Sequence, residues 1–393
     1  MSFQDIKGQD ITIQILKEHI RQARLSNGYL FVGPEGIGKK MVAKTLAKTL
    51  NCQEETLDAS TSSLDSARDD PERVKRVEGS LERHGERPST TLEDRALSER
   101  SESNGRSRTI DSCDKCTSCL KIEKNQHPDV HVFDGSTSLN INSEQSKNDR
   151  EDSQAIKIGH IRQLQKDIGL KPYEAKLKVF IIDNAHNLTA EASNALLKTL
   201  EEPPAQSLII LVSAKPTLLF KTIISRCQVL KFYPMARPKL EGVLKKDYSL
   251  ESNLSHFLAY FCEGRIGCAL RLKDTDIMRD KNRVIDQFCI LRKSNLESLP
   301  IQSKENLRNY LNILAGWFRD IYLIKIGMPY LELINLDRKS DLLKFIQSFS
   351  FLDLDEIFNC ISNSLFYIEQ NINIRLLLSN LSEAISYGAR RAT

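Results

Sequence analysis

The stretch GPEGIGKK at residues 33–40 decides the fold of this chain. The apolar run YLFV precedes it, and a segment with helical spacing, KKMVAKTLAKTL, follows at 39–50. A short buried strand, a glycine-rich turn and a helix are the context of a phosphate-binding loop, whose pattern is G-x-x-x-x-G-K followed by Ser or Thr. Gly33, Gly38 and Lys39 fit this pattern. The sequence therefore predicts an α/β domain with a parallel sheet, built around a P-loop.

Position 40 breaks the pattern, because a lysine stands where the hydroxyl residue is expected. In an active NTPase that hydroxyl helps to hold Mg²⁺, whereas the Lys40 ammonium can only donate hydrogen bonds. We expect Gly33, Gly36, Gly38 and Lys39 to keep the shape of a nucleotide site that binds ATP weakly or not at all. An inherited turn that binds nothing and a working hydrolytic site are the alternatives.

The segment VFIIDNAH at 179–186 supplies the second half of such a site. Apolar residues that end in an aspartate at a strand tip resemble a Walker B segment, so Asp183 would stand near the Mg²⁺ of a bound nucleotide. An ATPase of this class carries a glutamate next, as the base for the attacking water, but Asn184 follows here. The alternative is that Asp183 only caps a turn. The changes at positions 40 and 184 both argue against hydrolysis.

A cluster of cysteines, CDKCTSC, begins at residue 113. Cys113, Cys116 and Cys119 are separated by two residues each, so a tight turn brings their sulfurs together, and tetrahedral zinc needs one further ligand. We choose Cys52, at the end of the helix after the P-loop, and expect a closed, structural Zn²⁺ site. Three free thiols in a polar turn are one alternative. Two histidines are alternatives for the fourth ligand: His127 and His131.

The tripeptide SRC at 225–227 ends a helix-like segment that follows an apolar strand. At that place Arg226 would project from the edge of the domain toward a neighbouring subunit. A planar, permanently charged guanidinium suits contact with a nucleotide phosphate there. The alternative is that Arg226 forms only a structural salt bridge.

Strand and helix patterns alternate through residue 232, and from about residue 236 onward only helical patterns occur. We expect strands at 29–33, 177–183, 207–213 and 228–232, and helices at 3–26, 39–50, 156–170, 189–202, 305–327 and 354–370. Thr189 is the expected cap of its helix. On the first helix one apolar face is expected to hold Ile11, Ile15, Leu16 and Ile20.

The bulk composition excludes several classes of protein. The 393 residues carry 56 Lys and Arg against 52 Asp and Glu, and a net charge of +4 is too small to argue for nucleic-acid binding. No uncharged apolar run approaches the roughly 20 residues that span a bilayer, and the N-terminus lacks a signal-peptide pattern. We expect a cytoplasmic protein of two or three domains with reduced cysteines. A polar, highly charged insertion is expected at 53–111, and a polar loop at 135–154.

Taken together and in this order, these features resemble one family: the delta-prime subunits of the bacterial DNA polymerase III clamp loader, which are related to the gamma/tau subunits of the same complex. The resemblance covers most of the chain and rests on YLFVGPEGIGK at 29–39, the cysteine cluster, HPDV at 127–130, NALLKTLEEPP at 194–204, TIISRCQ at 222–228 and NINIRLLLSNL at 371–381.

The resemblance implies an AAA+ domain at 1–232 that carries a zinc module, a helical lid domain at 233–297 and a helical collar domain at 298–393. It also implies a five-membered ring with gamma/tau and delta subunits that uses ATP to place the sliding clamp on primer-template DNA. The chain would then be part of the DNA-directed DNA polymerase III holoenzyme, a nucleotidyltransferase, without catalysis of its own.

Within such a ring, the resemblance makes Arg226 an arginine finger that acts in trans on an adjacent gamma-type site. Members of the family also carry an arginine in the lid that senses nucleotide in cis, but Cys268 stands at that position, with Arg265 offset from it. An ATP-hydrolysing motor of the gamma/tau type is the alternative reading, and a zinc-dependent nucleic-acid-binding module is a third.

Overall fold

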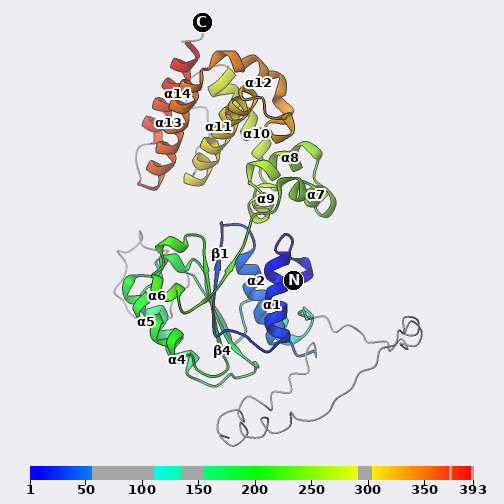
Figure 1. The fold of residues 1–393 in the computed structure, drawn as a ribbon, viewed down its shortest axis with the longest axis vertical. Helices are drawn as coiled ribbons and strands as arrows, with labels where there is room; N and C mark the ends of the chain where they lie inside the picture. Colours follow the sequence, from blue (N-terminus) through cyan, green and yellow to red (C-terminus); the bar gives the residue numbers. More distant parts are fainter. Residues whose placement is uncertain (55–109, 135–154, 291–302, 371–373, 391–393) are drawn as a thin grey trace, which may run out of the picture.

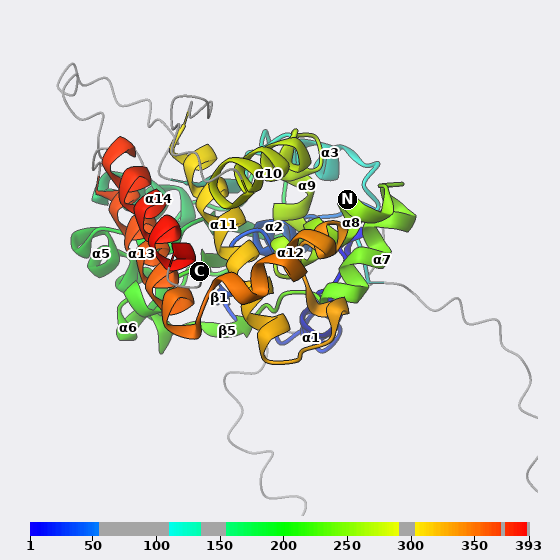
Figure 2. The same ribbon diagram turned by 90° about the horizontal axis from the view of Figure 1, so that it is seen from above.

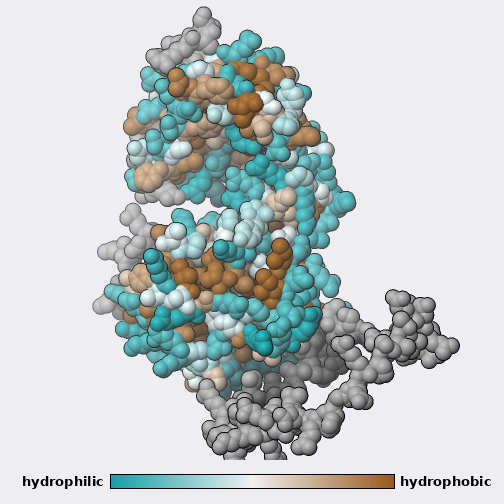
Figure 3. All heavy atoms as spheres, viewed as in Figure 1, coloured by the Kyte–Doolittle hydropathy of each residue, from teal (hydrophilic) through white to brown (hydrophobic). Residues whose placement is uncertain are grey.

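The structure is a computed structural model that describes residues 1–54, 110–134, 155–290, 303–370 and 374–390. An α/β part holds the N-terminal residues, and a helical part lies beyond it along the long axis of the molecule (Figure 1). Seen from above, the helical part overlies the α/β part (Figure 2). A notch separates the two on one side, and apolar side chains lie on the α/β part below that notch (Figure 3). Within the described ranges, no helix combines the length and apolarity needed to cross a bilayer.

The α/β part is built on a parallel sheet with the strand order β2-β3-β4-β1-β5. Parallel neighbours need crossover connections, which the helices between them supply. The central strands are buried on both faces, which explains their nearly continuous apolar runs. The strands are β1 (Gly28–Val32), β2 (Val130–Phe133), β3 (Lys178–Ile182), β4 (Ser207–Ser213) and β5 (Gln228–Lys231).

Alternate residues of each strand face two separate cores. One core joins Phe31 and its neighbours to the helices α1 (Asp10–Arg21) and α2 (Lys39–Leu50). The other joins Phe180 and its neighbours to three helices on the opposite face: α4 (Ile158–Ile168), α5 (Ala190–Glu201) and α6 (Lys221–Ile224). Figure 1 shows these two helix layers on either side of the sheet. The sheet is thus covered on both faces, as the sequence predicts for a P-loop domain.

The first helix departs from the prediction in its bounds and in its apolar face. It runs from Asp10 to Arg21 rather than from residue 3 to residue 26, and its buried apolar residues are Ile13, Leu16 and Ile20. Ile11 is 75% exposed and Ile15 is 39% exposed, so the expected apolar face was wrong for both. At 100° per residue, positions 13, 16 and 20 share a face that positions 11 and 15 do not.

Every element described after β5 is a helix or a helical turn. One continuous apolar core joins this helical part, from Met235 to Ile385. The predicted boundary near residue 297, the insertion apart from its ends, and the loop at 135–154 lie outside the described residues. The helices are α7 (Arg237–Asp247), α8 (Ser252–Phe261), α9 (Ile266–Leu272), α10 (Ile277–Ile285), α11 (Lys304–Lys325), α12 (Lys339–Phe345), α13 (Phe351–Glu369) and α14 (Ile374–Arg390).

Polar contacts tie the loop between α11 and α12 to several helices of the helical part. His256 Nε2 on α8 lies 2.8 Å from the carbonyl of Leu333 and donates to it. Asp320 on α11 accepts the backbone N–H of Ile334 at 3.0 Å. Lys281 on α10 pairs with Asp337 at the end of the same loop, so the loop holds α8, α10 and α11 together.

Two elements escaped the sequence analysis: strand β2 and the helix α3 (Thr117–Glu123). Their segments are short, and β2 is only partly buried at its centre. The HPDV segment leads into β2, and the carboxylate of Asp129 accepts the backbone N–H groups of Tyr173, Glu174 and Ala175 at 2.8–3.0 Å. These bonds outweigh the effect of burial and lower the pKa of Asp129. This motif residue therefore fixes the chain entering β3.

We predict that Asp129→Asn lowers the free energy of unfolding by about 3 kcal/mol at pH 7, because an amide nitrogen would face N–H donors that now meet a carboxylate. Since the folded pKa is depressed, this contribution is present above the unfolded value of about 3.9 and is lost as pH falls through the lower folded value. Urea unfolding followed by circular dichroism measures it. The control Asp10→Asn alters an exposed pair with Lys239 and should change stability by less than about 1 kcal/mol; equal effects of both variants would contradict this role for Asp129.

Candidate functional site

The P-loop connects β1 to α2 and keeps the backbone of a phosphate-binding loop. Gly33, Gly36 and Gly38 all have positive φ angles. Gly36, at φ 76°, and Gly38, at φ 96°, lie in the left-handed region that side chains disfavour. Gly38 is also the N-cap of α2, so the loop leads directly into the helix as the sequence predicts.

Lys39 is turned back onto its own loop. Its Nζ donates to the carbonyls of Gly33 and Pro34, both at 2.6 Å, and the residue is only 6% exposed. Burial lowers the pKa of Lys39 to about 8, against the opposing influence of Glu35 and Asp183. The ammonium that would serve a bound phosphate is thus satisfied by the protein itself.

Lys40 not only stands in place of the expected hydroxyl residue but also forms ion pairs. Its Nζ lies 3.0 Å from Asp183 Oδ2 and 3.7 Å from Asp134 Oδ2. Asp183 stands at the carboxyl end of β3, and Asp134 follows the neighbouring strand β2. A side-chain cation therefore pairs with the carboxylate that would stand beside Mg²⁺ in an ATPase. Nothing in the sequence analysis had indicated that the lysine at position 40 pairs with the aspartate of the Walker B-like segment.

Asn184 follows Asp183 with a left-handed backbone, at φ 50°. Its backbone N–H donates to Asp183 Oδ1 at 3.0 Å. An amide side chain has no basic group, so position 184 cannot accept a proton from an attacking water at neutral pH.

The N-terminal end of α9 lies against the crest of the P-loop. The backbone N–H of Gly267 donates to the carbonyl of Gly36 at 2.7 Å. A Cβ atom added to Gly267 would lie 2.7 Å from that same oxygen, closer than real side chains come. The two glycines thus allow direct backbone contact between the α/β part and the helical part.

Cys268, at the position expected for a sensing arginine, follows Gly267 in this contact. A hydrogen bond from Cys262 lowers the pKa of Cys268 to about 6 against the effect of burial, helped by nearby arginines. Arg265 Nε donates to the carbonyl of Cys262 at 3.0 Å. Arg265 is therefore engaged with the backbone of its own segment.

Arg226 lies at the end of α6, next to the edge strand β5. Its Nη2 is 2.7 Å from Glu201 Oε1 on α5. Its Nη1 donates to the carbonyl of Thr222 at 3.1 Å. The next residue, Cys227, is buried, and burial raises its pKa to about 12. Cys227 thus anchors the tripeptide in the core, while the guanidinium of Arg226 stays partly exposed.

The four predicted cysteines meet. The sulfur atoms of Cys52, Cys113, Cys116 and Cys119 all lie within 4.8 Å of one another. Cys52 follows α2, and the other three surround the start of α3. The buried ammonium of Lys48 links these helices through ion pairs to Asp114 and Glu123.

Burial and hydrogen bonds shift the pKa values of the thiols in this cluster. The backbone N–H of Cys116 lies 3.3 Å from Cys113 Sγ, and that of Cys119 lies 3.4 Å from Cys116 Sγ. Burial by itself would raise the pKa of Cys116, but backbone N–H groups and neighbouring thiols lower it to about 7. Burial raises the pKa values of Cys113 and Cys119.

The two alternative histidine ligands lie elsewhere. His127 accepts the backbone N–H of Asp129 at its Nδ1, at 3.1 Å. The ring of His131 stacks on Phe180, with 5.0 Å between centroids. Neither belongs to the group of possible metal ligands found among the described residues.

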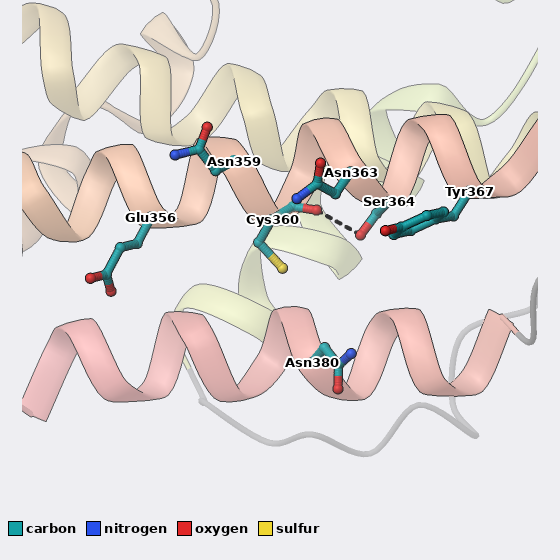
Figure 4. A pocket seen from close by; sticks show the side chains of 7 residues that line it. All are labelled: Glu356, Asn359, Cys360, Asn363, Ser364, Tyr367 and Asn380. Atoms are coloured by element: carbon teal, nitrogen blue, oxygen red, sulfur yellow. Dashed lines mark hydrogen bonds between the residues drawn. The ribbon is translucent and has the colours of Figure 1, made fainter.

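A cavity of about 380 Å³ lies between α13 and α14 (Figure 4). Amides and hydroxyls line it, and Ser364 Oγ donates to the carbonyl of Cys360 at 2.8 Å. It belongs to the helical part and is separate from the P-loop (Figure 1). Its lining residues are Glu356, Asn359, Cys360, Asn363, Ser364, Tyr367 and Asn380.

Comparison with known proteins identifies the family. A parallel sheet with a P-loop after β1 and an aspartate at the end of β3 defines a P-loop protein, here of the AAA+ class. The family model for "DNA polymerase III, delta subunit" matches residues 8–71 and 89–236, which is more than half of the chain. The chain belongs to this family of clamp-loader proteins.

Curated relatives agree with that assignment. The chain is 26% identical over 329 residues to DNA polymerase III subunit delta' of Bacillus subtilis, covering 81% of this chain and 78% of that protein. It is 26% identical to subunit tau of the same organism, over 70% of this chain and 38% of that protein. It is 28% identical to subunit gamma of Buchnera aphidicola, over 69% of this chain and 57% of that protein.

Solved structures are less similar. A gamma subunit-related protein of Thermotoga maritima has a TM-score of 0.34 and 16% identity, covering 70% of this chain and 90% of that one. The Bacillus subtilis clamp loader delta protein has a TM-score of 0.33 and 11% identity, covering 95% of this chain and 99% of that one.

We predict that Gly267→Ala weakens the contact between α9 and the P-loop. Alanine favours a helix over glycine by about 1 kcal/mol, so the control Gly242→Ala in α7, whose Cβ would meet nothing within 4 Å, should stabilise the protein by up to about that amount. Gly267→Ala should instead lower the free energy of unfolding by about 1–3 kcal/mol, because the new methyl group displaces Gly36. Urea unfolding and amide hydrogen exchange at position 267 measure this; equal stabilisation by both variants would argue against a tight contact.

Proposed function

We propose that this clamp-loader subunit acts as the delta-prime type: it does not hydrolyse ATP and supplies Arg226 in trans to the nucleotide site of an adjacent gamma-type subunit. In this proposal it works in a five-membered ring with gamma/tau and delta subunits. The ring places the sliding clamp on primer-template DNA during replication. The relatives named delta', tau and gamma support a role among such subunits.

The ion pair between Lys40 and Asp183 carries the proposal. In phosphoryl transfer the metal ion bridges phosphate oxygens and neutralises the developing charge, and an acidic residue at the strand tip helps to hold it. Here Asp183 is already paired with a cation at 3.0 Å. Binding Mg²⁺ would require that pair to separate and would bring two cations together, so the arrangement opposes hydrolysis in this chain.

The other departures act in the same direction. Asn184 offers no base for water, and Cys268 offers no positive charge to a γ-phosphate. Lys39 is satisfied by the carbonyls of its own loop. Each change removes a part that hydrolysis needs within the chain, whereas Arg226 is a part that acts on a neighbour.

A motor of the gamma/tau type remains the second candidate, because the glycines of the P-loop keep positive φ angles. The two candidates differ in one measurable property, which is ATP turnover by the isolated chain. The delta-prime type requires none, whereas the motor type requires turnover that Lys39→Ala abolishes.

We also propose that Cys52, Cys113, Cys116 and Cys119 hold one structural Zn²⁺ ion. Four thiolates around zinc at 2.3 Å have sulfur–sulfur distances of about 3.8 Å, and Cys113 Sγ lies 4.0 Å from Cys119 Sγ. The residues therefore fit the ion. When bound, zinc would cross-link the end of α2 to the start of α3.

For the zinc site, the expected result is one zinc per purified wild-type chain and little or none in Cys113→Ser, because an alcohol is a poor replacement for a thiolate ligand. Elemental analysis of protein dialysed against metal-free buffer measures this. The control Cys360→Ser, on α13 and outside the cluster, should retain one zinc. Undiminished zinc in Cys113→Ser would remove that ligand from the proposal.

For the arginine, Arg226→Ala should leave the fold intact, since the side chain is partly exposed, and should lower DNA-stimulated ATPase of the reconstituted complex. An arginine finger contributes roughly 10³-fold or more to comparable sites, so at least the share of turnover due to that one site should vanish. Steady-state phosphate release measures it, with the isolated chain assayed in parallel. An unchanged rate in the complex, or turnover by the isolated chain at a motor-like rate, would refute the proposed function.

A further inference from the structure

We propose that Glu201 is a positioning residue for Arg226, an inference that rests on the proposed function. The observation is the ion pair between Arg226 Nη2 and Glu201 Oε1 at 2.7 Å, which joins the end of α5 to the end of α6. Glu201 would act on the neighbouring nucleotide site only through the guanidinium, by holding it at the edge of the domain before a partner arrives.

The backbone beneath this pair is fixed by packing. A Cβ added to Gly28 in β1 would meet Leu200 at 3.2 Å and Cys227 at 3.5 Å, so the residues next to Glu201 and Arg226 pack against the same strand. Both Leu200 and Cys227 are buried. The two charged residues therefore start from anchored positions, and only their side chains remain to be ordered.

The location of Glu201 is electrostatically unusual. It is the last residue of α5, where the helix carries partial negative charge and a carboxylate is disfavoured. The Arg226 guanidinium offsets that charge. Arg226 also donates to the carbonyl of Thr222 and lies within 3.4 Å of Ser225 Oγ, so three oxygens hold the group and one of them is charged.

This arrangement suits a residue that must be ordered yet available. The side chain of Arg226 is 36% exposed and that of Glu201 is 47% exposed. Exposed ion pairs of this kind contribute little to stability. An arginine, however, loses much rotamer freedom when it is held in place, and a guanidinium has five N–H donors. Two of the contacts are made by Nη1 and one by Nη2, so they use three of the five N–H groups. A phosphate oxygen can therefore bind the remaining N–H groups while Glu201 still orients the guanidinium.

The test uses the full chain in the reconstituted complex with sliding clamp and primed DNA. Glu201→Gln, which keeps the shape but removes the charge, should slow turnover at the site that Arg226 serves about two- to fivefold. The kcat of DNA-stimulated ATPase should therefore fall by less than in Arg226→Ala, and the KM for ATP should stay unchanged. Glu201→Asp, which keeps the charge, should recover part of the loss. Size-exclusion chromatography checks that each variant still enters the complex.

A matched control lies one residue away. Glu202 is exposed and its side chain forms no ion pair with the residues that the structure describes, so Glu202→Gln removes the same charge and should leave the rate unchanged. In the Arg226→Ala background, Glu201→Gln should have no further effect, because Glu201 acts through the missing guanidinium.

The outcomes separate this inference from the proposed function. If Arg226→Ala has no effect, the proposed function fails. If Arg226→Ala lowers the rate but Glu201→Gln behaves like Glu202→Gln, the positioning role is refuted. A rate increase in Glu201→Gln, or a further loss in the Arg226→Ala background, would also overturn it, since the carboxylate would then restrain the arginine or act by another route.

Discussion

Parallel strands end at the same edge of a sheet, and the candidate nucleotide site depends on that constraint. The P-loop follows β1, Asp183 ends β3 and Asp134 follows β2, so residues far apart in the chain are brought to one edge. Burial on both faces of the sheet fixes their spacing. Lys40 extends from the first turn of α2 into this edge and meets both carboxylates.

Groups of the protein itself satisfy the charges of the P-loop lysines at this edge. Lys39 is satisfied by loop carbonyls, and Lys40 is satisfied by Asp183. The contact of Gly36 with Gly267 then covers the crest of the loop with the helical part. In this geometry the loop connects strand to helix and supports α9, and these structural roles need no nucleotide.

Different strands carry the parts of the proposed function. Asp183 follows the interior strand β3 and Asp134 follows the edge strand β2, and Lys40 pairs with both, whereas Arg226 precedes the other edge strand, β5. Arg226 is held by a counter-charge rather than buried. In the proposed function, a nucleotide site whose aspartate is paired with a lysine and an arginine that acts on a partner therefore lie on one sheet.

Much of the fold follows from local sequence patterns. The strands β1, β3, β4 and β5, the helix α2 and the Thr189 cap of α5 agree with the prediction within one or two residues, because apolar runs and caps are local signals. Strand β2 and helix α3 were missed because their segments are short. The face of α1 was misjudged because Ile11 and Ile15 are apolar yet exposed.

The amino-acid sequence by itself determined the P-loop, the loss of its hydroxyl and the cysteine quartet, since spacing and residue type carry that information. Only the tertiary structure decided that Lys40 pairs with Asp183, that Glu201 holds Arg226 and that Gly267 contacts Gly36. These contacts join residues from 25 to more than 200 positions apart, and no local pattern encodes which distant side chain a charge or an N–H group will meet.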